Sequence, residues 1–332
     1  MNSNTRPGAK DTTPARIHLL AHANPIQKDI DRFEFASASD YASFICGHLP
    51  TGSRLTYSPK IFAAREDVQH GGRIDDAARI RDLQGAIDDP HTAAIIALAG
   101  GAWLGRVLPH IDPSSLQQRK HPLIISGFSE ITGLLNWLAT YKCVRAYYWL
   151  CPNYLAWKIA PPAAARTALG EFWKDLPRHF DSTNPDATIR GTLVRGTLKP
   201  GRTRIVGGCL SVLVATLAGP IARRVQPTGA WLALEDIGEA VYRIDRYLAT
   251  LKLAGWFDRI AGILLGDFHT KDEPDQTAAI LELLKYHLPR ERKLPIVVTR
   301  DVGHVWPIRP LLINRPLRLL LKGKSVSFTA EA

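Results

Sequence analysis

Leu123-Ile124-Ile125-Ser126-Gly127-Phe128-Ser129-Glu130 is a short apolar run that ends in glycine and serine. The apolar part predicts a buried strand, and the apolar spacing of Ile131 to Thr140 predicts a helix. Ser129 therefore falls on the turn between them. A serine on such an elbow presents an exposed hydroxyl close to a helix N-terminus, as a nucleophile requires. The turn lacks the second glycine of the G-x-S-x-G pattern, so simple helix capping is the alternative.

Besides the serine, a serine hydrolase needs a histidine and a carboxylate, and the sequence offers candidates for both. Glu235 directly follows the apolar run Trp231 to Leu234, which places it at a predicted strand end. Asp236 and Glu239 compete with it, although both could instead favour the positive start of the next helix. His304 follows Gly303 and the predicted strand Val297-Val298-Thr299, with a surface-loop histidine as the alternative.

The alternation of expected strands and helices in the first half of the sequence predicts a parallel α/β sheet. Strands are expected at 17–21 and 93–98, with a helix at 75–87 between them and Gly100-Gly101 after the second strand. Ligands of such sheets gather at the carboxyl ends of the strands, where both Gly100-Gly101 and Ser129 fall.

The chain divides into a predicted tail, two domains and a linker. Residues 1–14 are polar and are expected to form a flexible tail, and residues 15–162 a domain that carries the nucleophile. Residues 163–191 contain turn-like material and are expected to link this domain to the next. Residues 192–332 are expected to form a second α/β domain with a strand-rich core, including a helix at 238–253 and a strand at 260–265.

Composition favours a globular protein without a membrane span. The 332 residues are 45% hydrophobic and 22% charged. No run of about 18 uncharged apolar residues occurs, and the N-terminus lacks the apolar stretch of a secretory signal. The four cysteines form no C-x-x-C pair, which suits a reducing compartment. Neither H-E-x-x-H nor a Walker A loop is present, so we expect no metal and no cofactor.

The formal net charge of +11 raises the question of nucleic-acid binding. The positive residues are dispersed, however, and no aromatic stripe lies between them. We therefore expect solvated faces, or a basic cleft that attracts an anionic peptide, and no nucleic-acid partner.

Several segments in fixed order resemble the LD-carboxypeptidase family of serine peptidases. The resemblance spans roughly residues 15 to 320 and is sharpest in Leu234-Glu235-Asp236-Ile237-Gly238-Glu239, Tyr242-Arg243-Ile244-Asp245-Arg246 and Ala261-Gly262-Ile263-Leu264-Leu265-Gly266. It implies a flavodoxin- or Rossmann-like N-terminal domain, with the active site in a cleft between this domain and the second. It also implies a cytoplasmic homodimer.

The resemblance assigns roles to the candidate residues. Ser129 would be the nucleophile, His304 the general base and Glu235 the acid that orients it. The oxyanion would be held by backbone N–H groups at Gly101 and Glu130, with Gly100 in the same loop.

Three departures from the family pattern concern the substrate site. Ala99-Gly100-Gly101-Ala102-Trp103 stands where murein-cleaving members have Arg-Gly-Gly-Tyr-Gly, and Glu130 replaces an aspartate. Leu150-Cys151-Pro152 replaces a His-Gly-Pro segment. We therefore take Trp103 and Trp149 as candidate pocket residues. The aromatic concentration around Trp149 is either a packed insert or a stacking wall for a ring-bearing substrate.

The sequence thus predicts a metal-independent serine carboxypeptidase that cleaves an L,D-peptide bond. The favoured reaction is release of the terminal D-alanine from a murein tetrapeptide. A self-immunity peptidase that inactivates a peptide-nucleotide or other modified peptide antibiotic is the first alternative. A peptide-binding homologue that has lost catalysis is the second.

Overall fold

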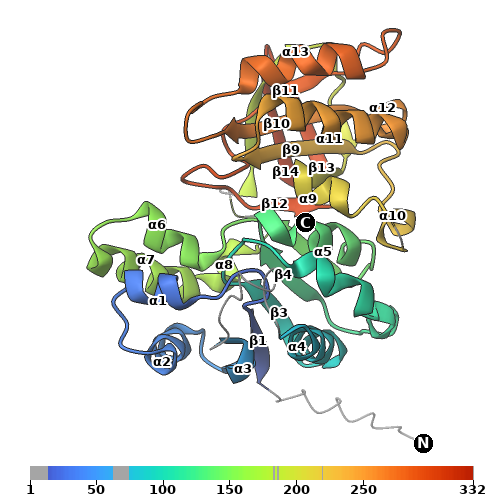
Figure 1. The fold of residues 1–332 in the computed structure, drawn as a ribbon. Helices are drawn as coiled ribbons and strands as arrows, with labels where there is room; N and C mark the ends of the chain where they lie inside the picture. Colours follow the sequence, from blue (N-terminus) through green and yellow to red (C-terminus); the bar gives the residue numbers. More distant parts are fainter. Residues whose placement is uncertain (1–13, 63–74, 182–183, 185–186, 219, 332) are drawn as a thin grey trace, which may run out of the picture.

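Two sheets organise the chain, as the computed structural model in Figure 1 shows. The structure describes residues 14–62, 75–181, 184, 187–218 and 220–331, so the predicted tail lies almost wholly outside the described residues. The predicted α/β class, with a parallel sheet and a second strand-rich sheet, is confirmed.

The first sheet is parallel except at one edge. Its order within the described residues is β12 (Leu311–Ile313), β5 (Val144–Tyr148), β4 (Leu123–Gly127), β3 (Thr92–Ala97), β1 (Ala15–Leu20) and β2 (Ser53–Thr56). Its central strands are apolar on both faces, as expected of a parallel sheet covered by helices. The accompanying helices are α1 (Gln27–Arg32), α2 (Ala38–His48), α3 (Pro59–Phe62), α4 (Asp76–Asp88), α5 (Thr132–Leu138), α6 (Leu155–Lys158), α7 (Pro162–Lys174) and α8 (Leu176–His179).

The second sheet is mixed. Its order is β7 (Gly201–Thr203), β13 (Leu317–Lys322), β14 (Ser325–Ala330), β6 (Ile189–Arg195), β11 (Ile296–Val298), β10 (Gly262–His269), β9 (Trp231–Ile237) and β8 (Ile205–Cys209). The four strands from β11 to β8 are parallel to one another. The helices of this part are α9 (Leu210–Ala215), α10 (Pro220–Arg224), α11 (Val241–Leu253), α12 (Trp256–Arg259) and α13 (Thr277–His287).

Most predicted elements of the parallel core are present within a few residues. The predicted strands 17–21, 93–98 and 260–265 correspond to β1, β3 and β10, and the predicted helices 75–87 and 238–253 to α4 and α11. The helix expected from Ile131 begins as a single 3-10 turn, Ser129–Ile131, before α5.

The segment that we expected to be a linker is largely helical. Residues 162–174 form α7, with Pro162 at its first position, and α8 follows directly. Proline at the first helical position leaves no intrahelical bond unmade, and the alanines after it favour helix. Helix α7 packs against α2 and α6, so this segment belongs to the body of the first sheet.

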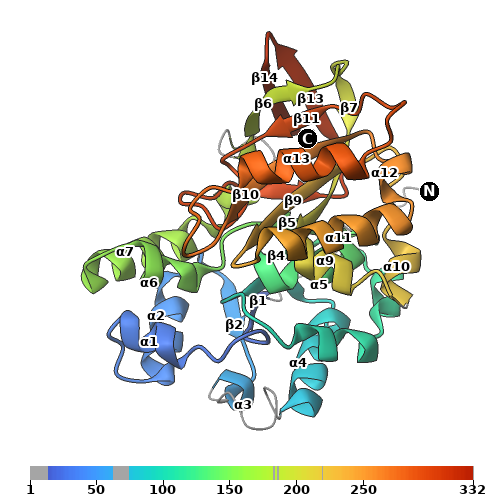
Figure 2. The ribbon, with the colours of Figure 1, turned by 45° about the horizontal axis from the view of Figure 1, so that its top comes forward.

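Helix α5 lies where the two sheets meet, as Figures 1 and 2 show. All seven of its residues are buried, and it contacts β4 and β5 on one side and β8 and α9 on the other. The Asn136 amide donates to the Gly207 carbonyl at 2.8 Å and accepts from the Gly207 N–H at 2.8 Å. Asn136 therefore satisfies both backbone groups of Gly207 in β8, which is an edge strand among the strands that the structure describes.

Strand β12 adds a second connection, because it comes late in the chain but pairs antiparallel with β5 of the first sheet. Arg315, just beyond it, donates to the carbonyls of Ala139 at 2.8 Å and Val144 at 2.5 Å, and also to that of Tyr141. One guanidinium thus satisfies several carbonyls around the start of β5.

We predict that Arg315→Leu lowers the free energy of unfolding by about 3 kcal/mol, because it leaves these carbonyls without their charged donor. Urea titration followed by circular dichroism measures the change. Arg318→Leu is the control: Arg318 is an exposed arginine on the neighbouring strand β13. Its loss is expected to change stability by less than about 0.5 kcal/mol. Equal effects of the two substitutions would contradict the assignment.

Candidate active site

Ser129 lies two residues beyond the carboxyl end of β4, with a backbone φ of 62°. This left-handed conformation is costly for a residue with a side chain and is typical of nucleophile elbows. The strand before the turn packs closely at Gly127, since a Cβ at that position would lie 2.7 Å from Cβ of Ala97. Ser129 is not the N-cap residue of the 3-10 turn or of α5, since Phe128 and Ile131 hold those positions and neither makes a side-chain capping bond. The capping alternative is therefore not what the structure shows.

Glu235 and His304 form a buried pair. Glu235 lies within β9, two residues before its end, and its side chain is fully buried. One carboxylate oxygen, Oε2, is 2.8 Å from Nδ1 of His304. Burial lowers the pKa of His304, but Glu235 outweighs it, with support from Asp236 and Asp267, so the pKa lies above 6.5. Because Nδ1 is bonded to Glu235, Nε2 is the ring nitrogen of His304 that can accept a proton from a nucleophile.

The two competing carboxylates have other partners. Asp236 accepts the N–H of Ser211 at 2.7 Å, at the start of α9, and the N–H of Ile237 at 2.9 Å. Glu239 lies 3.4 Å from Arg243 one turn along the chain. Among the three candidates, Glu235 is therefore the one bound to His304.

Tyr148 joins Ser129 to this pair. Its hydroxyl accepts the backbone N–H of Ser129 at 3.0 Å and donates to Oε1 of Glu235. The ring of Phe128, the residue before Ser129, lies 4.9 Å from the His304 ring, centroid to centroid. Figure 2 shows the ends of β4 and β5 meeting the second sheet beside β9. The structure thus brings Ser129, Glu235 and His304 into one cluster.

The glycine loop after β3 lies against the elbow, as predicted. A Cβ on Gly100 would lie 3.0 Å from Cβ and 3.3 Å from Oγ of Ser129. Gly101 has φ of 136°, and a side chain there would collide with the amide of Asn24. Gly100 therefore leaves the loop close to the nucleophile, and Gly101 lets the loop pass the side chain of Asn24.

Charged side chains hold this loop in place. The Glu130 carboxylate accepts the N–H of Leu104 at 2.9 Å, and burial raises its pKa. Arg79 of α4, fully buried, donates to the carbonyl of Trp103 at 3.1 Å and to that of His22 at 2.6 Å. Position 99 carries no arginine, but Arg79 supplies a cation behind the loop.

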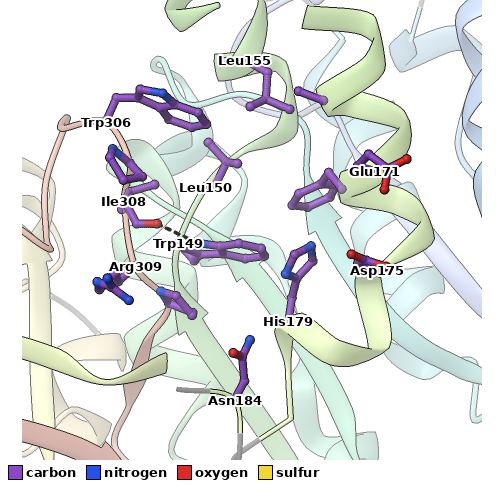
Figure 3. A pocket seen from close by; sticks show the side chains of 14 residues that line it. Trp149, Leu150, Leu155, Glu171, Asp175, His179, Asn184, Trp306, Ile308 and Arg309 are labelled. Carbon is purple, nitrogen blue, oxygen red and sulfur yellow. Dashed lines mark hydrogen bonds between the residues drawn. The ribbon is translucent and has the colours of Figure 1, made fainter. Parts of the chain in front are cut away.

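The two candidate pocket tryptophans have different positions. Trp103 starts the turn after the glycine loop with φ of 76°. Trp149 is buried, and its indole N–H donates to the carbonyl of Ile308 at 3.0 Å. It forms one wall of a pocket of about 420 Å³ between α7 and the 305–310 loop, shown in Figure 3. Trp306 and Phe172 also line this pocket, whereas Ser129, Glu235 and His304 do not.

The aromatic concentration around Trp149 is mainly packed. Tyr147, Tyr148 and Trp149 are all buried, and Tyr154 donates its hydroxyl to the carbonyl of His304 at 2.8 Å. Leu150, in place of the family's histidine, lines the pocket of Figure 3. One face of the insert is therefore core and the other faces the pocket.

Sequence reasoning missed three residues of the site. Tyr148 and Arg79 are described above, and Asp267 lies close enough to Glu235 and His304 to influence the pKa of His304. A signal existed for Tyr148, because it is the last residue of the strand next to the one that carries Ser129. For Arg79 the signal was a charged residue on the otherwise apolar face of α4.

No group of three or more His, Cys, Asp or Glu side chains suited to a metal ion occurs among the described residues. The four cysteines are free thiols. In the same part of the chain, no helix has the length and apolar character needed to cross a bilayer.

Comparison with known proteins assigns the chain to a family. The LD-carboxypeptidase N-terminal domain matches residues 17–148, and the LD-carboxypeptidase C-terminal domain matches residues 202–319. The chain belongs to the LD-carboxypeptidase family. Ser129, Tyr148, Glu235 and His304 all lie within the two matched ranges, whereas Trp149 and Tyr154 lie between them.

Individual relatives match parts of this chain. A protein of Streptomyces coelicolor that carries the name of a carboxypeptidase is 36% identical over 200 residues, 58% of this chain and 59% of its own length. The probable murein peptide carboxypeptidase of Bacillus subtilis is 32% identical over 208 residues, 60% of each chain. These matches thus cover about three fifths of each relative.

Solved structures share the fold. The muramoyltetrapeptide carboxypeptidase of Oxalobacter formigenes superposes with a TM-score of 0.66 at 19% identity, over 96% of this chain and 100% of that one. The microcin C7 self-immunity protein, in complex with glutamyl sulfamoyl guanosine, superposes with a TM-score of 0.69 at 17% identity, over 96% and 97%. The fold of this chain is therefore shared by a muramoyltetrapeptide carboxypeptidase and by a microcin self-immunity protein.

The carboxyl group of Asp236 gives a prediction about pH. Burial, and then the charge of Glu235, raise its pKa from 3.8 to about 6. A raised carboxyl pKa stabilises the folded state below pH 4, and this stabilisation is lost as the pH rises through 6. We predict that the difference in unfolding free energy between wild type and Asp236→Asn falls by about 3 kcal/mol between pH 4 and pH 7.

Urea titration at a series of pH values measures this difference. The control is Asp272→Asn, at an exposed position, for which we expect a flat difference. A flat difference for Asp236→Asn as well would show that Asp236 titrates normally in the folded protein.

Proposed function

We propose that the protein is a serine carboxypeptidase that cleaves an L,D-peptide bond, with Ser129, His304 and Glu235 as its triad. The observation that carries the proposal is the fully buried Glu235 carboxylate bound to Nδ1 of His304 beside a serine at φ 62°. A buried carboxylate that orients a histidine is the arrangement that activates a serine hydroxyl. Membership of the LD-carboxypeptidase family supports the same reaction.

In this mechanism, Oγ of Ser129 attacks the carbonyl carbon of the terminal peptide bond. Nε2 of His304 takes the hydroxyl proton and later delivers it to the leaving amine, while Glu235 stabilises the imidazolium. Water then hydrolyses the acyl-enzyme with His304 as base.

The oxyanion would bind to backbone N–H groups at Gly101 and Glu130. The contact of Gly100 with Ser129 supports this placement, because it brings the glycine loop alongside the nucleophile. The N–H of Ser129 itself already donates to Tyr148. Each oxyanion donor is worth about 3 kcal/mol of transition-state stabilisation.

The proposed substrate is a murein tetrapeptide, and the proposed product is D-alanine. Relatives named as murein peptide and murein tetrapeptide carboxypeptidases support this substrate class. A cytoplasmic location and homodimerisation remain predictions from the family resemblance.

A second candidate is inactivation of a peptide-nucleotide antibiotic. The pocket of Figure 3 favours it, because Trp149, Phe172 and Trp306 offer ring surfaces next to the loop that follows His304. The microcin self-immunity protein, whose structures hold aminoacyl sulfamoyl nucleosides, shares the fold. Incubation with aspartyl sulfamoyl adenosine, followed by mass spectrometry, separates this candidate from the first.

We predict that wild type releases D-alanine from murein tetrapeptide and that Ser129→Ala lowers the rate by at least about 10³-fold, because the acyl-enzyme cannot form. Mass spectrometry of the products measures release, and calorimetry measures tetrapeptide binding by the variant. Ser126→Ala is the matched control, since Ser126 is a buried serine on β4, three residues before Ser129. Tetrapeptide binding without release by wild type would instead identify a binding protein.

The Glu235–His304 pair predicts the pH dependence of the reaction. Because Glu235 raises the pKa of His304, the acid limb of kcat/KM should lie above pH 6.5. In Glu235→Gln the effect of burial is opposed only by the smaller effects of Asp236 and Asp267, so the limb should move to lower pH while the plateau falls by about 10³- to 10⁴-fold. A pH–rate profile of both proteins measures this. Glu239→Gln, on an exposed ion pair, should keep the wild-type profile.

A further inference from the structure

Tyr148 is the last residue of β5 and is fully buried, yet its hydroxyl has a polar partner on each side. On one side lies the N–H of Ser129, and on the other Oε1 of Glu235. The first partner belongs to the first sheet and the second to the second sheet. A phenol has a single hydrogen. Since a backbone N–H can only donate, the Tyr148 hydrogen is directed to the carboxylate.

We infer that Tyr148 is a positioning residue of this site: its hydroxyl fixes the Glu235 carboxylate that orients His304 and at the same time anchors the backbone of the Ser129 turn. The inference rests on the proposed triad and adds a fourth side chain to it. Its hydroxyl bonds the Glu235 carboxylate and the backbone of Ser129, so Tyr148 acts through these two residues.

The packing around the ring supports this role. A Cβ on Gly208 would lie 2.7 Å from Cε2 of Tyr148, so the absence of a side chain at position 208 makes room for the ring. The ring of Phe128 meets that of Tyr148 edge-on, at 86° with centroids 6.3 Å apart. The ring therefore has little freedom to move its hydroxyl away from Glu235. Burial and the nearby Glu235 also raise the pKa of Tyr148 well above 10, which keeps the donor protonated.

The Tyr148 bond affects the two protonation states of His304 unequally. When His304 is neutral, the full charge of Glu235 depends on its hydrogen-bond donors. When His304 is protonated, the imidazolium itself neutralises much of that charge. Removing the Tyr148 donor therefore costs the neutral-histidine state more, and the proton affinity of the pair rises.

Other charged or titratable groups face the pair and stay in place. Asp236 on β9 and Asp267 on β10 act on His304, and the Cys209 thiol on β8 lies close to Glu235. His269 is bonded to Asp267, with Nδ1 2.6 Å from Oδ2. A substitution at Tyr148 alters none of these groups. A change in the titration of His304 would therefore result from loss of the Tyr148 hydroxyl.

The test compares Tyr148→Phe with Tyr147→Phe. Tyr147 is its neighbour on the same strand, is also buried, and donates its hydroxyl to the carbonyl of Phe180 at 3.1 Å. Both substitutions thus remove one buried hydroxyl from β5. The first readout, which needs no substrate, is NMR titration of the imidazole nitrogens of His304, assigned by His304→Gln. The second is the pH dependence of kcat/KM.

For Tyr148→Phe we expect the His304 titration and the acid limb to move up by about one pH unit, and kcat/KM to fall about tenfold. For Tyr147→Phe we expect no displacement of either. Unmoved titration in Tyr148→Phe, or equal losses of activity in both variants with unmoved limbs, would overturn the inference. If the titration of His304 shifts as expected but the wild type releases no D-alanine, the proposed substrate is contradicted and the role of Tyr148 is not.

A second variant guards against loss of folding. Incorporation of 3-fluorotyrosine at position 148 keeps the ring and the hydroxyl but makes the phenol a stronger donor. It should move the His304 titration to lower pH, opposite to Tyr148→Phe. Movement in the same direction as Tyr148→Phe would contradict the inference.

Discussion

The site depends on one buried charge. Glu235 has no solvent exposure, and an ionised carboxylate is stable there only if both of its oxygens are bonded. His304 supplies one partner and Tyr148 the other. The first comes from the same half of the chain and the second from the opposite half. The carboxylate is therefore satisfied only when the two sheets are docked, so folding and assembly of the site are one event.

The docking surface consists of polar contacts set into an apolar interface. Asn136 of α5 bonds both backbone groups of Gly207, and the Thr132 hydroxyl accepts the N–H of Cys209 at 3.1 Å. These bonds fix the register of β8 against α5. Since β8 is hydrogen-bonded to β9, the same contacts set where Glu235 meets Tyr148. Apolar burial alone would hold the sheets together without specifying this register.

Local patterns were enough to predict the strand, elbow and helix around Ser129, and to prefer Glu235 over Asp236. The reason is that each depends on neighbouring residues in the chain. Tyr148 could not be predicted in this way, because its contact with Glu235 joins strands 87 residues apart. Residues 163–191 were interpreted as a linker from their prolines. The helix that forms there needs the packing of α2 and α6, which local composition does not report. The domain boundaries themselves remain a prediction.

Strand β12 has a consequence for how such a protein can be divided. It is three residues long, it lies near the end of the chain, and it closes the edge of the first sheet beside β5. A truncated protein that lacked the second half would also lack β12. Strand β5 would then be an open edge with unpaired backbone groups, which other chains could pair with. The first half of the chain therefore depends on a strand from the second half to close its sheet.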